Sequence, residues 1–297
     1  MRREQSSAEA AAIRHEDNGV GEVRTSVLRA TFASRLGQTL IGNKYHTAPI
    51  KIAKAFPLDG QLGVIVMDVS PGLLSGDRYE LEWTAEQHSH VMITNQSYTK
   101  VHPSLPNSDS SMQQLFELET DAVVEHMPEP IMLYKEAAFR NDTQVRLQKG
   151  SAWLQADVLC PGRTLRGERF DYRSYSNSLT VHYGEELIFS QRQRVVPGSQ
   201  VITAPGSWDE MTHWATFYMF SDRVNSSHLE QLQEKLDSFE APEAHKVIGG
   251  ASMTYRYGVA VSAASTAAWP LQQLMQELWQ TARMGLLGKP PLRFLQG

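Results

Sequence analysis

Two carboxylates, Asp77 and Glu168, stand in turn-rich parts of this sequence, where side chains are easily placed for chemistry. Asp77 closes a Ser-Gly-Asp turn between the apolar run 62–69 and the segment 79–84, whose apolar and polar residues alternate as in a half-buried strand. Glu168 follows Gly167 in a second turn between strand-like segments. Paired carboxyl groups can act as acid and base in hydrolysis, and the same oxygens can bind a divalent cation. An ordinary turn role explains Asp77 equally well.

The surroundings of Glu168 also offer a simple structural explanation. Arg163, Arg166 and Arg169 lie within five residues of it. Surface ion pairs between such neighbours are common and contribute little to stability. The sequence therefore leaves open whether Glu168 serves a site or only pairs with a nearby arginine.

Histidines supply a second set of candidate ligands. The chain has ten, and imidazole suits nickel, copper and zinc. His88 and His90 alternate as on one face of a strand, which makes them candidate metal ligands. Two exposed polar positions would give the same spacing. The sequence contains no HExxH, CxxC or EF-hand motif that would define a closed metal site.

Other catalytic schemes find little support in the sequence. Cys160 is the only cysteine, and a buried, inert thiol explains it more simply than a nucleophile. No G-x-S-x-G elbow is present, and the Gly-Gly pair in 247–250 precedes a strand-like segment rather than a helix. We therefore expect neither intrinsic NTPase nor dehydrogenase activity, and no enzyme.

Composition narrows the class of protein. The 297 residues carry a net charge of −5 with a pI near 6.1, which argues against a nucleic-acid partner. No apolar stretch approaches the roughly eighteen residues of a membrane span. A single cysteine fits a reducing compartment, so the cytoplasm is the expected location. Residues 1–21 lack an apolar segment, and we expect them to form a disordered tail.

Periodicity predicts a mainly β fold. Short strand-like segments follow one another from about residue 22 to 201, without the long helices of a doubly wound sheet. Two helices are predicted in the C-terminal third, one opening on a Ser227–Glu230 capping box and one over 268–288. The predicted organisation is a single β-rich domain over 22–297. Inward faces of the predicted elements carry the tryptophans Trp83, Trp153 and Trp279.

Several short motifs follow one another along the chain. They are Pro71-Gly72, Ser75-Gly76-Asp77-Arg78-Tyr79, Thr94 to His102, Pro128-Glu129-Pro130-Ile131, Gly162 to Phe170, and the C-terminal Leu278-Trp279, Arg283 and Leu287-Gly288. Taken in this order, they resemble the UreD (also called UreH) family of urease accessory proteins, whose closing helix the C-terminal residues fit. Ser75, Ser97-Tyr98 and His102 depart from the family's pattern.

The resemblance implies an irregular, β-helix-like stack of many short strands with two α-helices. It implies a urease maturation chaperone that binds UreF directly and UreG through UreF, within a dimeric heterocomplex that docks on the urease apoenzyme. Transient Ni²⁺ is the implied cargo, with no permanently bound cofactor. Asp77 and Glu168 match positions implicated in an internal, water-filled nickel path.

The residues themselves are compatible with a transfer role, because scattered carboxylate and imidazole ligands exchange a metal more readily than a thiolate cage. Two alternatives stay open. One is a hydrolase that uses Asp77 and Glu168 as its acid and base. The other is a purely structural adaptor that never contacts the metal. It would dock a partner on the apolar faces of the C-terminal helices and on the segment Leu292–Leu295, although these could also pack on the protein's own sheets.

Overall fold

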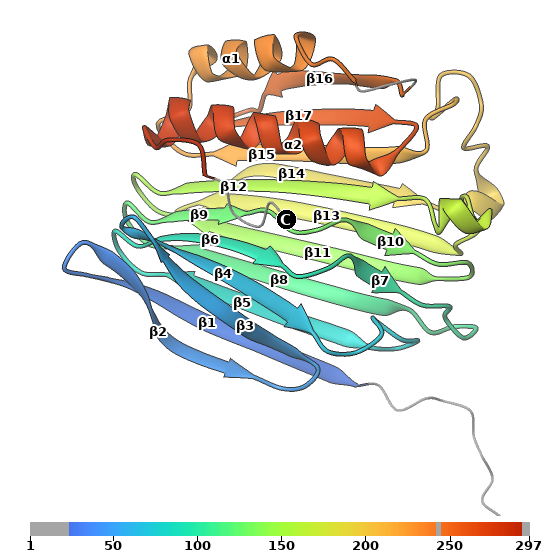
Figure 1. Ribbon diagram of the computed structural model, residues 1–297, viewed down its shortest axis with the longest axis horizontal. Coiled ribbons are helices and arrows are strands. Elements are labelled where there is room, and N and C mark those ends of the chain that lie inside the picture. Colours follow the sequence, from blue (N-terminus) through green and yellow to red (C-terminus); the bar gives the residue numbers. More distant parts are fainter. Residues whose placement is uncertain (1–23, 242–244, 293–297) are drawn as a thin grey trace, which may run out of the picture.

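The computed structural model describes residues 24–241 and 245–292, which form two facing β-sheets with helices on one side (Figure 1). The tail expected at residues 1–21 lies outside the described residues. Sheet A has the order β14-β13-β11-β8-β5-β1-β2. Its strands are β14 (Glu186–Val195), β13 (Ser174–Tyr183), β11 (Ala138–Leu147), β8 (Ser110–Leu118), β5 (Arg78–Ala85), β1 (Thr25–Arg35) and β2 (Gln38–His46).

Sheet B has the order β16-β17-β15-β12-β9-β6-β4-β3, and the short strands β7 and β10 extend it beside β12. These strands are β16 (Val247–Met253), β17 (Gly258–Ser265), β15 (His213–Phe220), β12 (Ala152–Cys160), β9 (Val123–His126), β6 (His90–Asn95), β4 (Gln61–Asp68), β3 (Ile50–Leu58), β7 (Thr99–Val101) and β10 (Ile131–Leu133).

The middle of the molecule is a two-sided coil. From β5 to β12 the chain passes alternately through sheet A and sheet B, and each strand pairs in parallel with the corresponding strand of the next coil. Antiparallel hairpins close both ends of the stack: β1–β2 and β3–β4 at one end, β13–β14 and β15–β17–β16 at the other. The predicted β-helix-like stack is confirmed.

Alternation along the strands builds the interior between the sheets. In β5 the apolar Tyr79, Leu81 and Trp83 are buried, while the intervening polar residues keep solvent contact. Aromatic rings continue across the coils, with centroid distances of 6.5 Å from Trp83 to Phe116 and 5.8 Å from Phe116 to Trp153. Trp83 and Trp153 are therefore core residues, as predicted.

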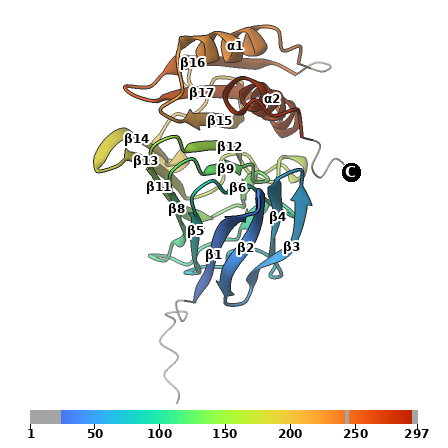
Figure 2. The same ribbon diagram turned by 90° about the vertical axis from the view of Figure 1, so that its left-hand side faces the viewer.

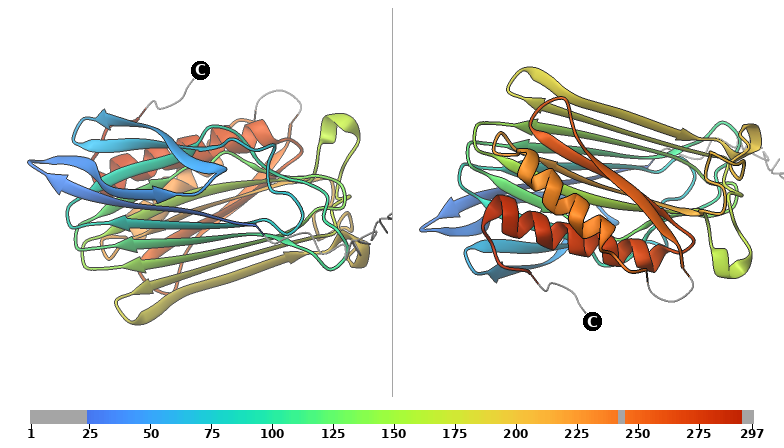
Figure 3. Two further views of the ribbon diagram at one scale, coloured as in Figure 1. Left: turned by 90° about the horizontal axis from the view of Figure 1, so that it is seen from below. Right: turned by 90° about the horizontal axis from the view of Figure 1, so that it is seen from above.

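The helices cover the outer face of sheet B only. Helices α1 (Ser226–Asp237) and α2 (Ala268–Ala282) lie against β12, β15, β16 and β17, and α2 continues into a π-helical turn, η3 (Arg283–Leu287) (Figures 2 and 3). The buried stripe of α2 includes Leu271, Leu278 and Trp279 and packs on apolar side chains of sheet B. The apolar helix faces thus pack on the protein's own sheet.

The start of α1 differs from the prediction. Asn225 is the N-cap, and its Oδ1 accepts a hydrogen bond from the Ser227 N–H at 3.0 Å. His228 completes the capping box, because its Nδ1 accepts from the Asn225 N–H at 3.1 Å. The Ser227–Glu230 capping box was wrong by two residues, because Asn and Ser are equally good caps in sequence.

Candidate functional site

Asp77 is a turn residue in the loop that joins β4 to β5. Its Oδ2 accepts a hydrogen bond from the Leu74 N–H at 2.8 Å, and its own N–H donates to the Leu74 carbonyl at 3.0 Å. These bonds fix the half-buried carboxylate against the Gly-rich loop. The predicted turn is confirmed.

Glu168 lies in the long loop between β12 and β13, just after the 3₁₀ turn η1 (Thr164–Arg166). Its side chain is 14% exposed and forms a two-pronged ion pair with Arg163, including an Nε–Oε2 distance of 2.8 Å. Arg163 holds the pKa of Glu168 below its usual range. The predicted pairing of Glu168 with a nearby arginine is confirmed. The strand that follows Glu168 begins only at Ser174, the start of β13, and Phe170 before it has a left-handed φ of 58°.

Side chains of successive coils connect the two acidic loops. His102 donates through Nε2 to the Pro71 carbonyl at 3.0 Å, and its ring meets Tyr134 with a centroid distance of 4.9 Å. The guanidinium of Arg163 lies 4.2 Å from the centroid of the Tyr134 ring. The structure therefore places Asp77 and Glu168 on stacked loops at the same end of the coil, without direct contact between their carboxylates.

Gly72 permits this loop stacking. Its φ is +130°, and a Cβ atom there would collide with the carbonyl oxygen of Lys100 in the next coil. The close approach carries the hydrogen bond from the Leu73 N–H to that carbonyl, at 2.9 Å.

We expect Gly72→Ala to lower the free energy of unfolding by about 2–3 kcal/mol, from backbone strain plus the collision. Urea denaturation of the full chain measures the loss. Gly198→Ala is the matched control, because a Cβ at Gly198 meets nothing within 4 Å. Equal stability of both variants would contradict this role for Gly72.

The two candidate histidines do not act together. His88 sits in a turn with a φ of 60°, and its Nδ1 lies 3.6 Å from an oxygen of Asp121. His90 begins β6, and its Nε2 lies 2.6 Å from an oxygen of the fully buried Glu125. The prediction that both imidazoles share a strand face was wrong, because the strand starts only at His90.

Glu125 is the centre of a buried charged cluster that sequence reasoning missed. Besides His90, it accepts a hydrogen bond from the Trp279 Nε1 at 2.5 Å and pairs with the guanidinium of Arg283. Burial alone would raise the pKa of Glu125, but His90 and Arg283 lower it below its usual value. The cluster joins β9 of sheet B to the end of α2. The only sequence signal was the family resemblance around Trp279 and Arg283.

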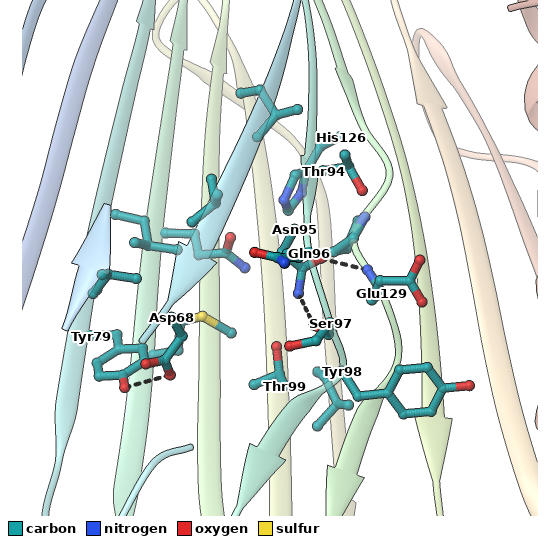
Figure 4. Close-up of a pocket in the computed structure, with 18 of the residues that line it drawn as sticks. Asp68, Tyr79, Thr94, Asn95, Gln96, Ser97, Tyr98, Thr99, His126 and Glu129 are labelled. Carbon is teal, nitrogen blue, oxygen red and sulfur yellow. Dashed lines mark hydrogen bonds between the residues drawn. The ribbon is translucent and has the colours of Figure 1, made fainter. Parts of the chain in front are cut away.

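A cavity of about 80 Å³ lies between the two sheets. Several water molecules fit in such a volume, and its polar lining can hydrogen-bond them. Figure 4 shows part of this lining, with His126, Thr94 and Asn95 on one side and Asp68 and Tyr79 on the other. Other polar residues that line it are Gln114, Asn141, Glu129 and Asp157.

The cavity's lining is mostly apolar, with side chains such as Leu81 and Trp83, and polar groups are set among them. His126 Nδ1 lies 2.8 Å from Gln155 Oε1, and Gln155 Nε2 donates to Asp157 Oδ2 at 2.5 Å. Burial lowers the pKa of His126 to about 4 and raises that of Asp157 to about 6. At neutral pH, His126 is therefore neutral, and Asp157 is a carboxylate without an ion-pair partner among the described residues.

One end of the cavity approaches the Asp77 loop. The Tyr79 hydroxyl donates to Asp68 Oδ2 at 2.8 Å, and both residues line the cavity. Burial first, and then the charges of Asp68 and Asp77, raise the pKa of Tyr79. Asp77 is thus close enough to this end to influence it electrostatically.

The donor set does not form a closed metal centre. Within residues 24–241 and 245–292, no three His, Cys, Asp or Glu side chains gather as a metal-binding group. Cys160 is buried and burial raises its pKa to about 12, as expected of an inert thiol. None of the helices in the same ranges is long and apolar enough to cross a membrane.

Comparison with known proteins agrees with this architecture. Residues 24–295 match the family model described as UreD urease accessory protein. The chain is 31% identical to the urease accessory protein UreD of Acetivibrio thermocellus, over 76% of the chain and 84% of that relative. It is 25% identical to UreD of Bacillus sp. strain TB-90, over 89% and 96%, and 26% identical to the urease accessory protein UreH of Helicobacter hepaticus, over 66% and 77%. The chain belongs to the UreD family of urease accessory proteins.

Proposed function

We propose that this protein is a cytoplasmic urease maturation chaperone that conducts Ni²⁺ through its interior while it holds UreF, and UreG through UreF, on the urease apoenzyme. The observation that carries the proposal is the cavity between the sheets, whose mostly apolar lining includes carboxylate, amide and imidazole groups that do not form a closed metal site among the described residues. The chain belongs to a family of urease accessory proteins, which supports a role in urease maturation.

The chemistry of the cavity suits transit better than storage. Carboxylate, amide and water ligands bind Ni²⁺ weakly and exchange it, whereas a preformed cage of thiolates or imidazoles would retain it. The interior carboxylates Asp68 and Asp157 offset part of the cost of removing a divalent cation from bulk water. The neutral His126 adds no repulsive charge.

Asp77 and Glu168 are proposed to serve the loop end of this route. Asp77 stands beside the Asp68–Tyr79 end of the cavity, so a cation that leaves there meets its carboxylate. Glu168 lies on a stacked loop and is held by Arg163. Loops at this end also expose large apolar side chains, which are suited to contact a partner protein. These side chains are Val69, Leu74, Leu105 and Leu165.

The hydrolase alternative receives no support from the geometry. Arg163 holds the pKa of Glu168 low, which disfavours this residue as a general acid, and Asp77 is hydrogen-bonded within its own turn. The adaptor alternative loses the helix faces as a docking surface, because they pack on sheet B. Most of its other candidate surface, the segment 292–295, lies outside the described residues.

The test is urease activation reconstituted from the apoenzyme, UreF, UreG, GTP and nickel. We expect Asp77→Ala and Glu168→Ala to slow activation and lower the nickel content of urease by roughly tenfold, the usual scale for lost metal-site residues. Glu185→Ala, an exposed turn residue at the opposite end of the coil, is the control. Full activation by both variants in normally assembled complexes would remove these residues from the route.

A further inference from the structure

Sheet B is interrupted at one place in two neighbouring strands. The chain leaves the sheet after Asn95, where β6 ends, and rejoins it at β7; it leaves again after His126, where β9 ends, and rejoins it at β10. Because β6 pairs with β9 and β7 with β10, the two gaps lie side by side. Residues of both gaps line the interior cavity. We call this interruption of the sheet, formed by 96–98 and 127–130, the window.

A hydrogen-bonded bridge from α2 closes the window. The Tyr98 hydroxyl donates to Gln272 Oε1 at 2.9 Å, and Gln272 Nε2 donates to Glu129 Oε2 at 3.2 Å. The Glu129 N–H donates to Asn95 Oδ1 at 2.6 Å, which ties the two gaps together. In Figure 4 the side chains of Tyr98 and Glu129 both project away from the interior toward the same side. One residue of α2 thus joins both rims of the window.

Glu129 is an unusual residue for such a position. It is half-buried, and the described residues provide it with no ion-pair partner. Burial raises the pKa of Glu129, which means that the folded protein disfavours its ionised carboxylate. A cation bound there would offset this free-energy cost. A carboxylate at the edge of a cavity that lacks a counter-charge is suited to receive a divalent cation and to release it again.

We propose that the window is the helix-side opening of the nickel passage, that Glu129 receives the cation there, and that the Tyr98–Gln272–Glu129 bridge keeps the opening closed until it is released. This inference rests on the proposed nickel passage. It adds the position of a second opening of the passage, Glu129 as the residue that binds the cation there, and the hydrogen-bonded bridge that controls entry.

The single cysteine provides a direct reporter of the bridge. Cys160 ends β12, pairs in register with Met132 of β10, and is 1% exposed. Met132 comes two residues after the 127–130 rim of the window, so its pairing places Cys160 next to this rim. Opening the bridge should therefore expose this thiol, independently of whether nickel is present.

The first experiment follows maleimide labelling of Cys160 in the full chain. We expect Tyr98→Phe and Gln272→Ala to speed labelling by roughly fivefold, the equivalent of one lost hydrogen bond. Tyr255→Phe is the control, because Tyr255 is 85% exposed and lies outside the window. Cys160→Ser sets the background. Unchanged labelling in both bridge variants would overturn the closing role of the bridge.

The second experiment measures nickel-dependent urease activation. Glu129→Gln keeps the acceptor for Gln272 and removes the charge, and Ser97→Trp adds bulk at an exposed window position. We expect each to slow activation by roughly tenfold, while Ser252→Trp, exposed on β16, leaves it unchanged. Labelling of Cys160 should stay at the wild-type rate in Glu129→Gln.

The two proposals fail in different ways. If Asp77→Ala slows activation but Glu129→Gln and Ser97→Trp do not, the passage stands and its second opening is not this window. If Asp77→Ala, Glu168→Ala and both window variants all activate urease at the full rate, the nickel passage itself is wrong.

Discussion

Asp157→Asn is expected to make the folded protein more stable at pH 8, by about 2 kcal/mol, and a poorer nickel conductor. Burial raises the pKa of Asp157 from an ordinary value of 3.8 to about 6, so the folded protein holds this carboxylate at a cost. A rise of that size corresponds to about 3 kcal/mol. Water in the cavity screens part of this cost, which leaves about 2 kcal/mol. Asparagine keeps the shape and removes the charge.

The stability gained by Asp157→Asn over the wild type should increase as the pH rises. Because the pKa of Asp157 is higher in the folded state, the folded protein binds a proton more readily than the unfolded chain between about pH 4 and 6. The wild type therefore loses stability as the pH rises through this range, and the loss is complete above it. The advantage of Asp157→Asn should be full at pH 8 and smaller at pH 5.

Urea denaturation at both pH values measures this difference. Asp59→Asn, at an exposed turn position, is the control and should change the free energy of unfolding little at either pH. A lower stability of Asp157→Asn at pH 8 would show that the carboxylate has a stabilising partner, contrary to the proposal. Slower urease activation by the more stable variant would show that the charge is kept for function.

The sequence predicted those parts of the fold that depend on local periodicity. Alternation in 79–84 placed Trp83 inside, and helical spacing placed Trp279 on the buried face of α2. The turn at Asp77 followed from its glycines and proline. The pairing of Glu168 with Arg163 was also within reach, because the two residues are five positions apart.

The residues of the interior cavity could not be predicted from the sequence, for a physical reason. Polar residues in alternating strands are expected to face solvent, yet Gln155 and Asp157 of β12 point into the space between the sheets. Their partners come from other coils, such as His126 of β9. These residues become neighbours only in the assembled stack, so no spacing along the chain predicts their contacts. The same holds for Tyr98 and Gln272, which are 174 residues apart.

Glu125→Gln is expected to lower the free energy of unfolding by about 3–5 kcal/mol, the usual loss when one partner of a buried ion pair is removed. Glu125 is fully buried, and Arg283, which pairs with it, is 2% exposed. Glutamine would leave the Arg283 guanidinium charged in the core without a counter-charge. The lost pairing also weakens the contacts of His90 and Trp279 with the same side chain.

Urea denaturation of the full chain at neutral pH measures this loss. Glu117→Gln is the matched control, because its ion pair with Arg146 lies on the surface and should contribute less than about 1 kcal/mol. A loss from Glu125→Gln as small as that of the control would mean that Arg283 reaches water when its partner is removed.

A double variant separates charge pairing from packing. Glu125→Leu with Arg283→Met removes both charges, so it should be more stable than Glu125→Gln alone, since no unpaired charge stays buried. It should not reach wild-type stability, because Trp279 Nε1 still loses its acceptor. The cluster fixes the C-terminal end of α2, whereas Gln272 bridges the window from the opposite end of the same helix. If the cluster anchors α2 against sheet B, Glu125→Gln should also speed labelling of Cys160, and the double variant should speed it less.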